Sequence, residues 1–558
     1  MRHYINLPHK ALDKALVKLI SFVKAREVIW LVTFIILVSA PLRLYQLNTL
    51  PPGLFGDEAA DGLDALSIIS GNRPIFLTEN NGREPLHAYL VALSTNVLGR
   101  TPAAVRLPSA LASILTILAI FLAAKAIIGT RIALITSIIG GFTVWPIMLG
   151  RLATRPALLP FLLSLTLWLV IEAYNKKNNK YWILSGLLLG ICFYTYTPIR
   201  LLILFPILCI STLLISQIRQ RIMIGVVYFS LSFATIVSPF VIYTVNNQEQ
   251  VLGRTTGVSI INFNDKPSET LNIMTSQTKA VLQMFSVPGK GDWNLRHNIP
   301  TRPVFDPTIT CVFLIGLAVA PRKLGKHKFI LISIYAIISL LPTILSEEAP
   351  HYGRASGILP ILFIFPALGV SWIYKYLNNI TTHFIAILTS SAIICGSILI
   401  TTDDYYFDAY LSQPNTGFWF DEQCTIAATD INKFIGSGWQ GDNEQYTNLE
   451  ALRTDKMVFI APNVCPQYSS SGYYTIQFLV PMYLGSTPPF QRYSLSSLPE
   501  HKTLAADLLF LCIPGDEDTL IPWLEKDYDI SIQDGPWTPP DKLGNSWLVY
   551  RSLYASSR

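Results

Sequence analysis

Residues 107–124 read LPSALASILTILAIFLAA, eighteen residues without a charged side chain between Arg106 and Lys125. A helix needs roughly 20 mostly apolar residues to cross the hydrocarbon core of a bilayer, so this stretch predicts a membrane span. The whole chain has the same character, because 51% of its 558 residues are hydrophobic and only 14% are charged. Soluble domains carry about 25% charged residues. The chain therefore has too little polar surface for water alone, and lipid must surround much of it.

Similar stretches predict a polytopic all-α membrane domain over residues 28–400, with eleven spans. The expected spans begin near Val28, Ala103, Ile132, Ala157, Tyr181, Leu201, Ile222, Thr308, Phe329, Ser356 and His383. The first is long for a signal peptide and lacks a convincing small-residue cleavage site, which favours a retained span. Residues 1–27 precede it as a short N-terminal segment.

The basic residues between the spans predict the orientation of the chain. They gather in alternate loops: Lys10, Lys14, Lys18, Lys24 and Arg26; Lys125 and Arg131; Lys176, Lys177 and Lys180; Arg219 and Arg221; Arg322, Lys323, Lys326 and Lys328; and Lys375. Cytoplasmic loops carry an excess of Lys and Arg, so the N-terminus is predicted to be cytoplasmic. The outer face then holds two long loops, residues 48–101 and 246–307, and a tail of residues 401–558.

Because the net charge of +6 is spread over short clusters, no nucleic-acid partner is expected.

The tail is predicted to be a separate, water-exposed α/β domain outside the cytoplasm. Short apolar runs at residues 457–461, 508–513 and 547–550 predict strands, and residues 426–435 predict a helix. We find no catalytic motif in the tail, which favours a structural or acceptor-docking role.

Three of the seven cysteines lie in the tail, and the other four lie inside apolar runs. The tail cysteines are Cys424, Cys465 and Cys512. They allow one disulfide, and their odd number leaves at least one thiol free.

The first outer loop carries the candidate chemistry, in the segment LFGDEAADGLDALSII of residues 54–69. At about 100° per residue, Asp57, Asp61 and Asp64 share one face of a helix. Such a helix would lie along the membrane surface with its acids toward water, and for Asp61 and Asp64 a solvated face is the expected role. Asp57 and Glu58 differ because they follow a glycine close to the end of the first span. A carboxylate there could take the proton from an acceptor hydroxyl as a general base.

This loop resembles the first outer loop of family 39 glycosyltransferases, which include protein O-mannosyltransferases and the lipid A aminoarabinose transferase. Their shared mark is an Asp-Glu pair, matched here by Asp57 and Glu58. The resemblance continues from Leu50 to about Pro366 through GREPLHAYLVAL, VRLPSAL, WPIMLGRLATRPALLPFLL, GLLLGICFYTYTPIR, GDWNLRHNIPTRPVFDP and HYGRASGILP. It implies a C-type glycosyltransferase fold, a lipid-phosphate-linked sugar donor and Asp57 as the catalytic base. Glu58 would orient Asp57 or a sugar hydroxyl.

Basic residues at the outer ends of the spans are candidates for the donor phosphate. Negative charge grows on that phosphate as the sugar leaves, and arginine suits it best because it cannot lose its charge. The candidates are Arg83, Arg155, Arg200, His351 and Arg354; Arg106, Arg151, Arg296 and His297 also lie at outer span ends. An arginine in such a place often only reaches lipid headgroups. His351 and Arg354 stand out because HYGR resembles the His-x-x-Arg turn of bacterial family members, although His351 could equally be a metal ligand or a turn residue.

The loop departs from the family at Glu84. Many relatives have His-Pro or Lys-Pro where this chain has Glu84-Pro85, with Arg83 one step earlier. A cation there would contact the donor phosphate, so Arg83 could substitute for it, whereas Glu84 could hold a metal. The family needs no metal for its chemistry, so we predict no metal and no other cofactor.

The sequence therefore predicts a hexosyl- or pentosyltransferase that uses a polyprenyl-phosphate sugar. The acceptor would be a protein, lipid or glycan, and the transfer a single inverting displacement. The outward-facing site and the bacterial look of the motifs favour the inner membrane of a bacterium.

Two other classes of protein remain as alternatives. A transporter or flippase for a lipid-linked sugar would need charged residues deep within its spans, whereas the ionisable residues here lie at span ends. It would also show broken helices at matching places in two halves, and none are found. A receptor-like assembly protein would leave the Asp57-Glu58 loop unexplained.

Overall fold

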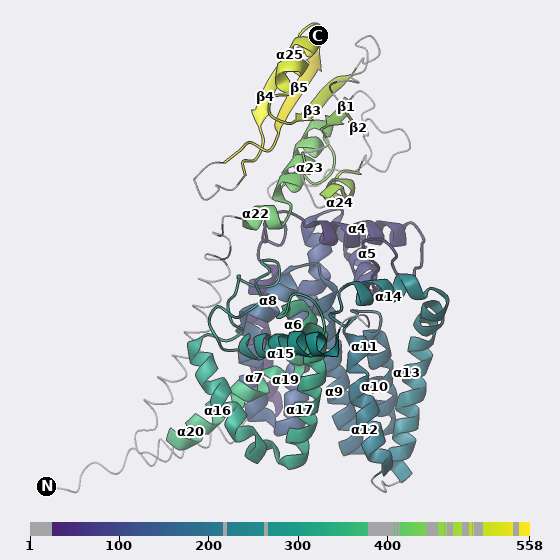
Figure 1. Ribbon diagram of the computed structural model, residues 1–558, viewed down its shortest axis with the longest axis vertical. Coiled ribbons are helices and arrows are strands. Elements are labelled where there is room, and N and C mark those ends of the chain that lie inside the picture. Colours follow the sequence, from purple (N-terminus) through teal and green to yellow (C-terminus); the bar gives the residue numbers. More distant parts are fainter. Residues whose placement is uncertain are drawn as a thin grey trace, which may run out of the picture.

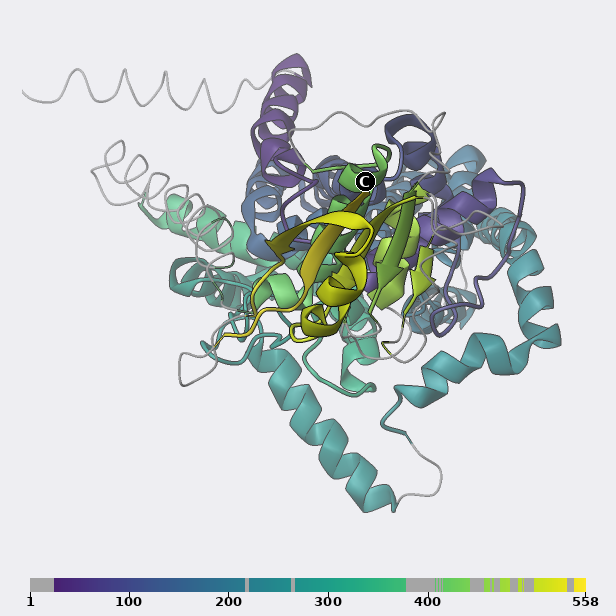
Figure 2. The same cartoon turned by 90° about the horizontal axis from the view of Figure 1, so that it is seen from above.

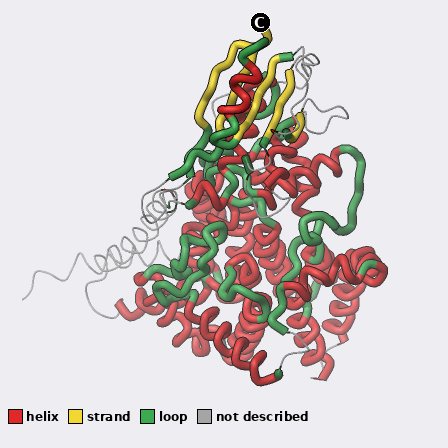
Figure 3. The backbone as a smooth tube through the Cα atoms, turned by 45° about the horizontal axis from the view of Figure 1, so that its top comes forward, coloured by secondary structure: helices red, strands yellow, loops and turns green. Residues whose placement is uncertain are grey.

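The structure, a computed structural model, describes residues 25–215, 220–261, 266–377, 407, 410, 413, 415–441, 456–461, 464–465, 472–481, 490–493, 495, 506–538 and 546–558. Its helices form one large body, and the tail sits at one end of that body (Figure 1). Seen from above, the tail lies over the helices (Figure 2). Figure 3 shows that the strands are confined to the tail.

Six helical segments of the described residues are long and apolar enough to cross a membrane. Three of them are α6 (Pro102–Ile128), α16 (Pro307–Leu324) and α17 (Lys326–Ile344). A fourth, Ile222–Asn246, is most of α13 (Gln220–Asn246). The other two join neighbouring helices: Glu27–Leu44 contains most of α2 (Ala25–Ser39) and all of α3 (Pro41–Leu44), and Arg155–Lys176 contains η1 (Arg155–Ala157) and α9 (Leu158–Lys176). Two bent helix pairs raise this number to eight if each pair is one span.

The first bent pair joins α7 (Thr130–Phe142) to α8 (Val144–Arg151) at an angle of 55°. The second is bent by 40°. It consists of α18 (Tyr352–Ala355), η2 (Ser356–Ile358) and α19 (Leu359–Leu362), followed by α20 (Ile364–Leu377). Arg151 is the last residue of α8, and Arg354 lies in α18.

The predicted count of eleven spans is not confirmed. The fifth is helix α10 (Asn179–Cys192), and the sixth is α11 (Ile199–Leu202) with α12 (Leu204–Ile215). Both are shorter than a full span because the chain turns at residues 193–198 between them. The eleventh expected span, near His383, lies outside the described residues.

Glycines let several helices of the membrane domain approach each other closely. A Cβ added to Gly316 of α16 would lie 1.7 Å from the carbonyl oxygen of Phe365 in α20. A Cβ on Gly369 of α20 would lie 1.9 Å from the carbonyl oxygen of Val312 in α16. Small residues at such crossings drive helix association in lipid, where the hydrophobic effect between helices is absent. The crossing of α16 and α20 therefore depends on two glycines.

The outer segments form four helices that lie outside the spans. The first loop holds α4 (Gly56–Ile69) and α5 (Leu86–Leu98), and the second holds α14 (Gln248–Gly257) and α15 (Pro267–Gln283). The helix expected from residues 54–69 is thus present. It lies across the end of the helical body, directly below the tail (Figure 1).

The described part of the tail contains one five-stranded sheet and four helices. Its strands are β1 (Lys456–Ile460), β2 (Phe490–Arg492), β3 (Asp507–Cys512), β4 (Tyr528–Asp534) and β5 (Arg551–Ser557), in the order β2-β1-β3-β5-β4. Strand β1 lies between β2 and β3 and is parallel to both, whereas β5 lies between β3 and β4 and is antiparallel to both. The helices are α22 (Thr416–Trp419), α23 (Glu422–Ile435), α24 (Gly472–Leu479) and α25 (Glu517–Leu524). Of the three runs predicted as strands, two coincide with β1 and β3, and residues 547–550 lead into β5.

The tail shares a hydrophobic core with the first outer loop. One cluster of buried residues includes Ala59 and Ala65 of α4, Val91 of α5, Ile431 of α23 and Leu479 of α24. The three tail cysteines are buried with free thiols, so no disulfide joins them. The first loop and the tail are therefore packed together as one unit.

Candidate active site

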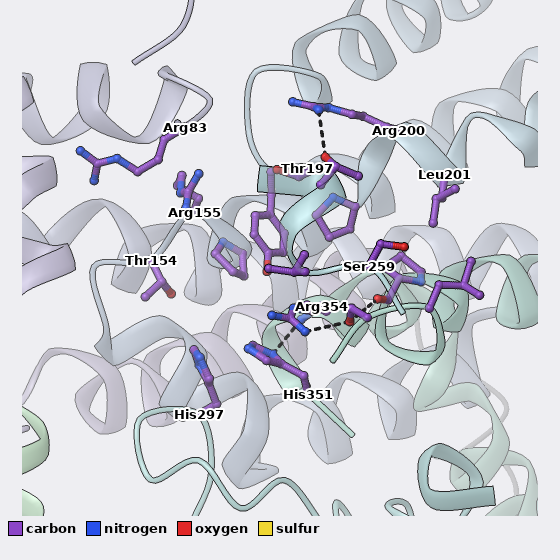
Figure 4. Close-up of a pocket in the computed structure, with 18 of the residues that line it drawn as sticks. Arg83, Thr154, Arg155, Thr197, Arg200, Leu201, Ser259, His297, His351 and Arg354 are labelled. Carbon is purple, nitrogen blue, oxygen red and sulfur yellow. Dashed lines mark hydrogen bonds between the residues drawn. The ribbon is translucent and has the colours of Figure 1, made fainter. Parts of the chain in front are cut away.

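A cavity of about 400 Å³ lies at one end of the helical body, beside the loop of residues 48–101. Its lining includes Asp57, Asp61 and Arg83 of the first loop; Thr154 and Arg155 after α8; Tyr196, Thr197 and Arg200 around α11; Thr255, Ser259 and His297 of the second loop; and Ser346, His351 and Arg354 after α17. Figure 4 shows basic side chains on several sides of this cavity. The segments that form it are spread over more than half of the chain.

Asp57 presents an exposed carboxylate to this cavity. It is the second residue of α4, which begins at Gly56 after an extended Phe55. Asn80 Nδ2 donates a hydrogen bond to Asp57 Oδ1 over 2.7 Å. The carboxylate is therefore held by one neighbour and still open to an incoming molecule, as a proton acceptor has to be.

Glu58 points away from the cavity and forms a buried ion pair with Arg106. Arg106 Nε and Nη2 lie 2.9 Å and 2.8 Å from the two carboxylate oxygens. The backbone N–H groups of Ala153 and Phe55 donate to the same carboxylate over 2.8 Å and 3.2 Å. Arg106 also donates to the carbonyl oxygens of Leu47, Pro51 and Gly53. The pair therefore ties the start of α4 to α6 and to the segment that follows α8.

Arg83, a candidate for the donor phosphate, bridges two acids of α4. Its Nη1 pairs with Asp61 and its Nη2 with Asp64. His87 Nδ1 lies 2.7 Å from Asp61 Oδ2, and His87 Nε2 lies 3.0 Å from Ser109 Oγ. The predicted solvated acidic face is therefore wrong for Asp61 and Asp64, because a guanidinium and an imidazole from the same loop cover them.

The two acids beside Arg83 differ in pKa. Burial opposes ionisation of Asp61, but Arg83 and His87 outweigh it and lower the pKa of Asp61 to about 2. Burial raises the pKa of Asp64 to about 6, aided by the charge of Asp61 and opposed by Arg83. Asp61 thus carries its negative charge throughout the neutral range.

Glu84 holds two of the candidate arginines beside the cavity. Arg200 Nη2 lies 2.9 Å from its Oε1, and Arg155 Nη1 lies 3.3 Å from its Oε2. Thr197 Oγ1 donates to Oε1 over 2.9 Å. The carboxylate is 1% exposed, so these donors surround it. Among the described residues there is no group of three or more His, Cys, Asp or Glu that could hold a metal ion.

The HYGR turn brings His351 and Arg354 to the cavity. The His351 ring caps α18, because its Nδ1 accepts a hydrogen bond from Arg354 N over 3.3 Å. Arg354 Nη1 donates to Ser346 Oγ over 2.8 Å and to the carbonyl oxygen of Glu347. Within the described residues, Nε and Nη2 of Arg354 make no hydrogen bond, so part of its fork is available to an anion. Figure 4 shows His351 and Arg354 side by side at the cavity.

His297 of the second loop stands next to His351, with ring centroids 4.6 Å apart. Burial, aided by the charges of Arg296 and Arg354, lowers the pKa of His297 to about 4. His297 is therefore neutral near pH 7, when it can offer both a hydrogen-bond donor and an acceptor.

Two buried carboxylates near the site were not singled out in the sequence. Asp292 accepts hydrogen bonds from the backbone N–H of Tyr352 over 2.7 Å and of Asn294 over 2.8 Å, which fixes the HYGR turn to the second loop. Asp421 of the tail accepts one from Gly56 N over 2.9 Å. The motif GDWN contains Asp292 and could have pointed to it. No local pattern marks Asp421, which lies 365 residues from its partner.

Known proteins resemble this chain in part of its sequence and in its fold. Residues 82–243 match the family described as dolichyl-phosphate-mannose-protein mannosyltransferase. No curated protein matches the chain.

Among solved structures, ArnT from Cupriavidus metallidurans bound to undecaprenyl phosphate aligns with a TM-score of 0.55 at 12% identity, over 95% of this chain and 98% of ArnT. Its apo form aligns with a TM-score of 0.52 at 13% identity, over 94% and 97% of the two chains. The Archaeoglobus fulgidus oligosaccharyltransferase aligns with a TM-score of 0.47 at 13% identity, over 82% of this chain and 64% of its own.

The helical body with a tail at one end and the matching segment agree with the resemblance found in the sequence. The chain is an integral membrane protein that shares the fold of ArnT, and residues 82–243 are similar to the mannosyltransferase family.

Proposed function

We propose that the chain transfers a sugar from a polyprenyl-phosphate donor to a protein, lipid or glycan on the outer face of a bacterial inner membrane. The observation that carries this proposal is a single cavity with an exposed carboxylate, Asp57, and several cations. The shared fold with ArnT, which was solved with undecaprenyl phosphate, supports a lipid-phosphate donor.

The donor phosphate would bind to Nε and Nη2 of the Arg354 guanidinium group. His351 lies beside it, and Glu84 holds Arg155 and Arg200 at the same cavity. Fixed cations stabilise the negative charge that develops on the phosphate as the sugar leaves. Arg83 would act on the donor through its charge, since both of its Nη atoms pair with acids of α4.

Asp57 would act as the general base. The acceptor oxygen or nitrogen attacks the anomeric carbon while Asp57 takes its proton. The bond between the anomeric carbon and the phosphate oxygen breaks, and its electron pair stays on the phosphate. Because this is a single displacement, the anomeric configuration is inverted. The products are the glycosylated acceptor and polyprenyl phosphate.

Glu58 and Arg106 would position Asp57 without touching the substrate. Both side chains are buried, and their ion pair fixes the first turn of α4. Of the two roles expected for Glu58, orienting Asp57 or orienting a sugar hydroxyl, its burial supports the first. A rigid first turn keeps the Asp57 carboxylate at one place relative to the cations, which is what a displacement reaction requires.

The test is sugar transfer from a labelled polyprenyl-phosphate donor by the purified wild type and by Asp57→Asn. The variant keeps the size of the side chain and loses the proton acceptor, so we expect transfer to fall by at least about 100-fold. Asp518→Asn, at an exposed position of α25, is the matched control and should keep wild-type turnover. Thermal unfolding in detergent shows whether each variant is folded.

Full turnover by Asp57→Asn would remove Asp57 as the base. If the wild type instead moves the intact lipid-linked sugar across proteoliposomes without transferring it, the chain is a flippase and the proposal fails.

A further inference from the structure

Three hydrogen bonds from the tail hold the backbone immediately before Asp57. Leu54 N donates to Thr425 Oγ1 over 2.8 Å, and Thr475 Oγ1 donates to the Leu54 carbonyl oxygen over 2.8 Å. Gly56 N donates to Asp421 Oδ2 over 2.9 Å. Asp421 and Thr425 lie at the start of α23, and Thr475 lies in α24. The tail therefore supplies side-chain partners to the backbone on which Asp57 is mounted.

The contact is also close at two glycines of the first loop. A Cβ on Gly53 would lie 2.4 Å from the carbonyl oxygen of Phe420, and Gly53 has a φ of +79°. A Cβ on Gly62 of α4 would lie 2.6 Å from the ring of Phe478. No side chain larger than glycine fits at either place without a shift of the tail. The first loop and the tail thus touch on both sides of Asp57, at Gly53 before it and at Gly62 after it.

At this junction the N-terminal end of α4 faces a buried acidic side chain of the tail. Gly56 is the first residue of this fourteen-residue helix, so its N–H carries part of the positive end of the helix dipole. The Asp421 carboxyl group accepts from that N–H and is buried, and burial raises its pKa to about 7. Arg296 of the second loop contacts both the first loop and the tail. Its Cζ lies 3.6 Å from the centroid of the Phe55 ring, and its Nε donates to the Trp419 carbonyl oxygen over 3.1 Å. Hydrogen bonds, helix polarity and packing all act on the first turn of α4.

We propose that the tail is a positioning element for the base, in which Asp421, Thr425 and Thr475 fix residues 54–56 and so hold Asp57 against the cavity. This inference rests on the proposed function, because it assumes that Asp57 is the base. Asp421 does not line the cavity and is a positioning residue. The tail thereby becomes part of the active site, although it has no catalytic motif.

The experiment compares Asp421→Ala with Asp421→Asn in the purified full-length protein. Alanine removes the acceptor of the Gly56 N–H, whereas asparagine keeps an oxygen that can accept it. Two readouts are taken: hydrogen exchange of the peptide that contains residues 54–60, and the kcat and donor KM of sugar transfer. Misplacing a reacting group by about 1 Å can cost roughly 100-fold in rate, so we expect kcat of Asp421→Ala to fall roughly 10- to 100-fold with KM within about two-fold.

Asp430→Ala is the matched control. Asp430 lies on the same helix α23 and is bound within the tail, where it accepts a hydrogen bond from Tyr550 Oη over 2.9 Å. Its loss weakens the tail without touching α4. We expect the peptide of residues 54–60 to exchange hydrogen faster in Asp421→Ala than in the wild type. In Asp421→Asn, both its exchange rate and kcat should stay near the wild-type values. In Asp430→Ala, the exchange rate of this peptide should not change. Thr475→Val, which removes only the hydroxyl bound to Leu54, replaces Asp421→Ala if the latter does not fold.

Equal effects of Asp421→Ala and Asp430→Ala would reduce Asp421 to a general stabiliser of the tail and overturn the inference. Unchanged exchange in Asp421→Ala, or faster exchange with wild-type kcat, would also overturn it. The proposed function is judged separately by Asp57→Asn, and the exchange readout does not depend on any activity. A failure of the base assignment is therefore distinguishable from a failure of the positioning by the tail.

Discussion

Asp57 and Glu58 are adjacent in the sequence, yet a helix turns successive side chains by about 100°, so the two face different surroundings. Asp57 reaches the cavity, while Glu58 turns into the protein toward Arg106. A buried carboxylate needs a partner charge and hydrogen bonds to offset the loss of water. Arg106 and two backbone N–H groups supply them. One residue of the pair is thus free for chemistry because the other anchors the turn.

We predict that Glu58→Ala destabilises the protein strongly. Removing one partner of a buried ion pair leaves an uncompensated charge and typically costs about 3–5 kcal/mol. The thermal unfolding midpoint in detergent should therefore fall well below that of the wild type. The double variant with Arg106→Ala should lose less than the sum of the two single losses. A shift no larger than that of the exposed control Asp518→Ala would contradict the role given to this pair.

A pH effect on stability is expected from His297. Its pKa is about 4 in the folded protein against 6.5 for an ordinary histidine, so between these values only the unfolded chain binds the proton. Stability from this residue is then present above about pH 6.5 and is lost as the pH falls toward 4. At pH 5 the loss is at most about 2 kcal/mol, and it is smaller where water in the cavity reaches the ring.

The measurement is the unfolding midpoint of the wild type and of His297→Gln at pH 7 and pH 5. The wild type should lose more stability between the two pH values than the variant, which has no group to protonate there. Identical losses in both proteins would show that His297 is not held neutral by its surroundings.

At the scale of elements, the packing of the membrane helices depends on close contacts between their backbones as well as on their hydropathy. Gly316 and Gly369 face each other's helix across the crossing of α16 and α20, where backbone oxygens lie within 2 Å of any added Cβ. The turn at residues 193–198 likewise ends α10 early and brings Thr197 and Arg200 to the cavity. Both features concern distances between backbones, which apolar composition alone does not specify.

We predict that Gly316→Val disrupts the crossing of α16 and α20. Overpacking of a tight site typically costs about 1–3 kcal/mol, and here the contact is with backbone, which cannot rotate away. The protein should unfold at a lower temperature in detergent. Gly253→Ala on α14 is the matched control, since an added Cβ there meets nothing within 4 Å. Equal midpoints for the two variants would refute the close crossing.

At the scale of the whole molecule, the tail, the first loop and the cavity lie at one end of the helical body (Figure 1). Under the proposed function, a sugar donor carried by a membrane lipid would meet its acceptor at that end. The distribution of Lys and Arg predicts that this end faces away from the cytoplasm.

The orientation predicts which tags can be reached from outside intact cells. A tag at the C-terminal Arg558 should be accessible, because the tail is predicted to lie outside the cytoplasm. A tag inserted after Lys177, in the exposed turn between α9 and α10, should become accessible only after the membrane is permeabilised. Protection of the C-terminal tag in intact cells would reverse the orientation.

Local patterns in the sequence were sufficient for part of this description. Long apolar runs predicted the helices of the membrane domain, and the 100° periodicity of residues 54–69 predicted α4. The Asp-Glu pair singled out Asp57, which among the described residues is an exposed carboxylate at the cavity. The predicted count of eleven spans is not confirmed, because the helices of the fifth and sixth expected spans are shorter than a full span and the eleventh lies outside the described residues.

The sequence by itself determined that this is a membrane protein, that it resembles family 39 glycosyltransferases, and where its chemistry-bearing loop begins. These properties depend on composition and on residues that are neighbours in the chain. Only the tertiary structure decided that Arg83 covers Asp61 and Asp64, that Glu84 holds Arg155 and Arg200, and that Asp421 binds Gly56 N. The partner of a buried charge is whichever group folding brings within hydrogen-bond reach, and up to 365 residues separate these partners along the chain.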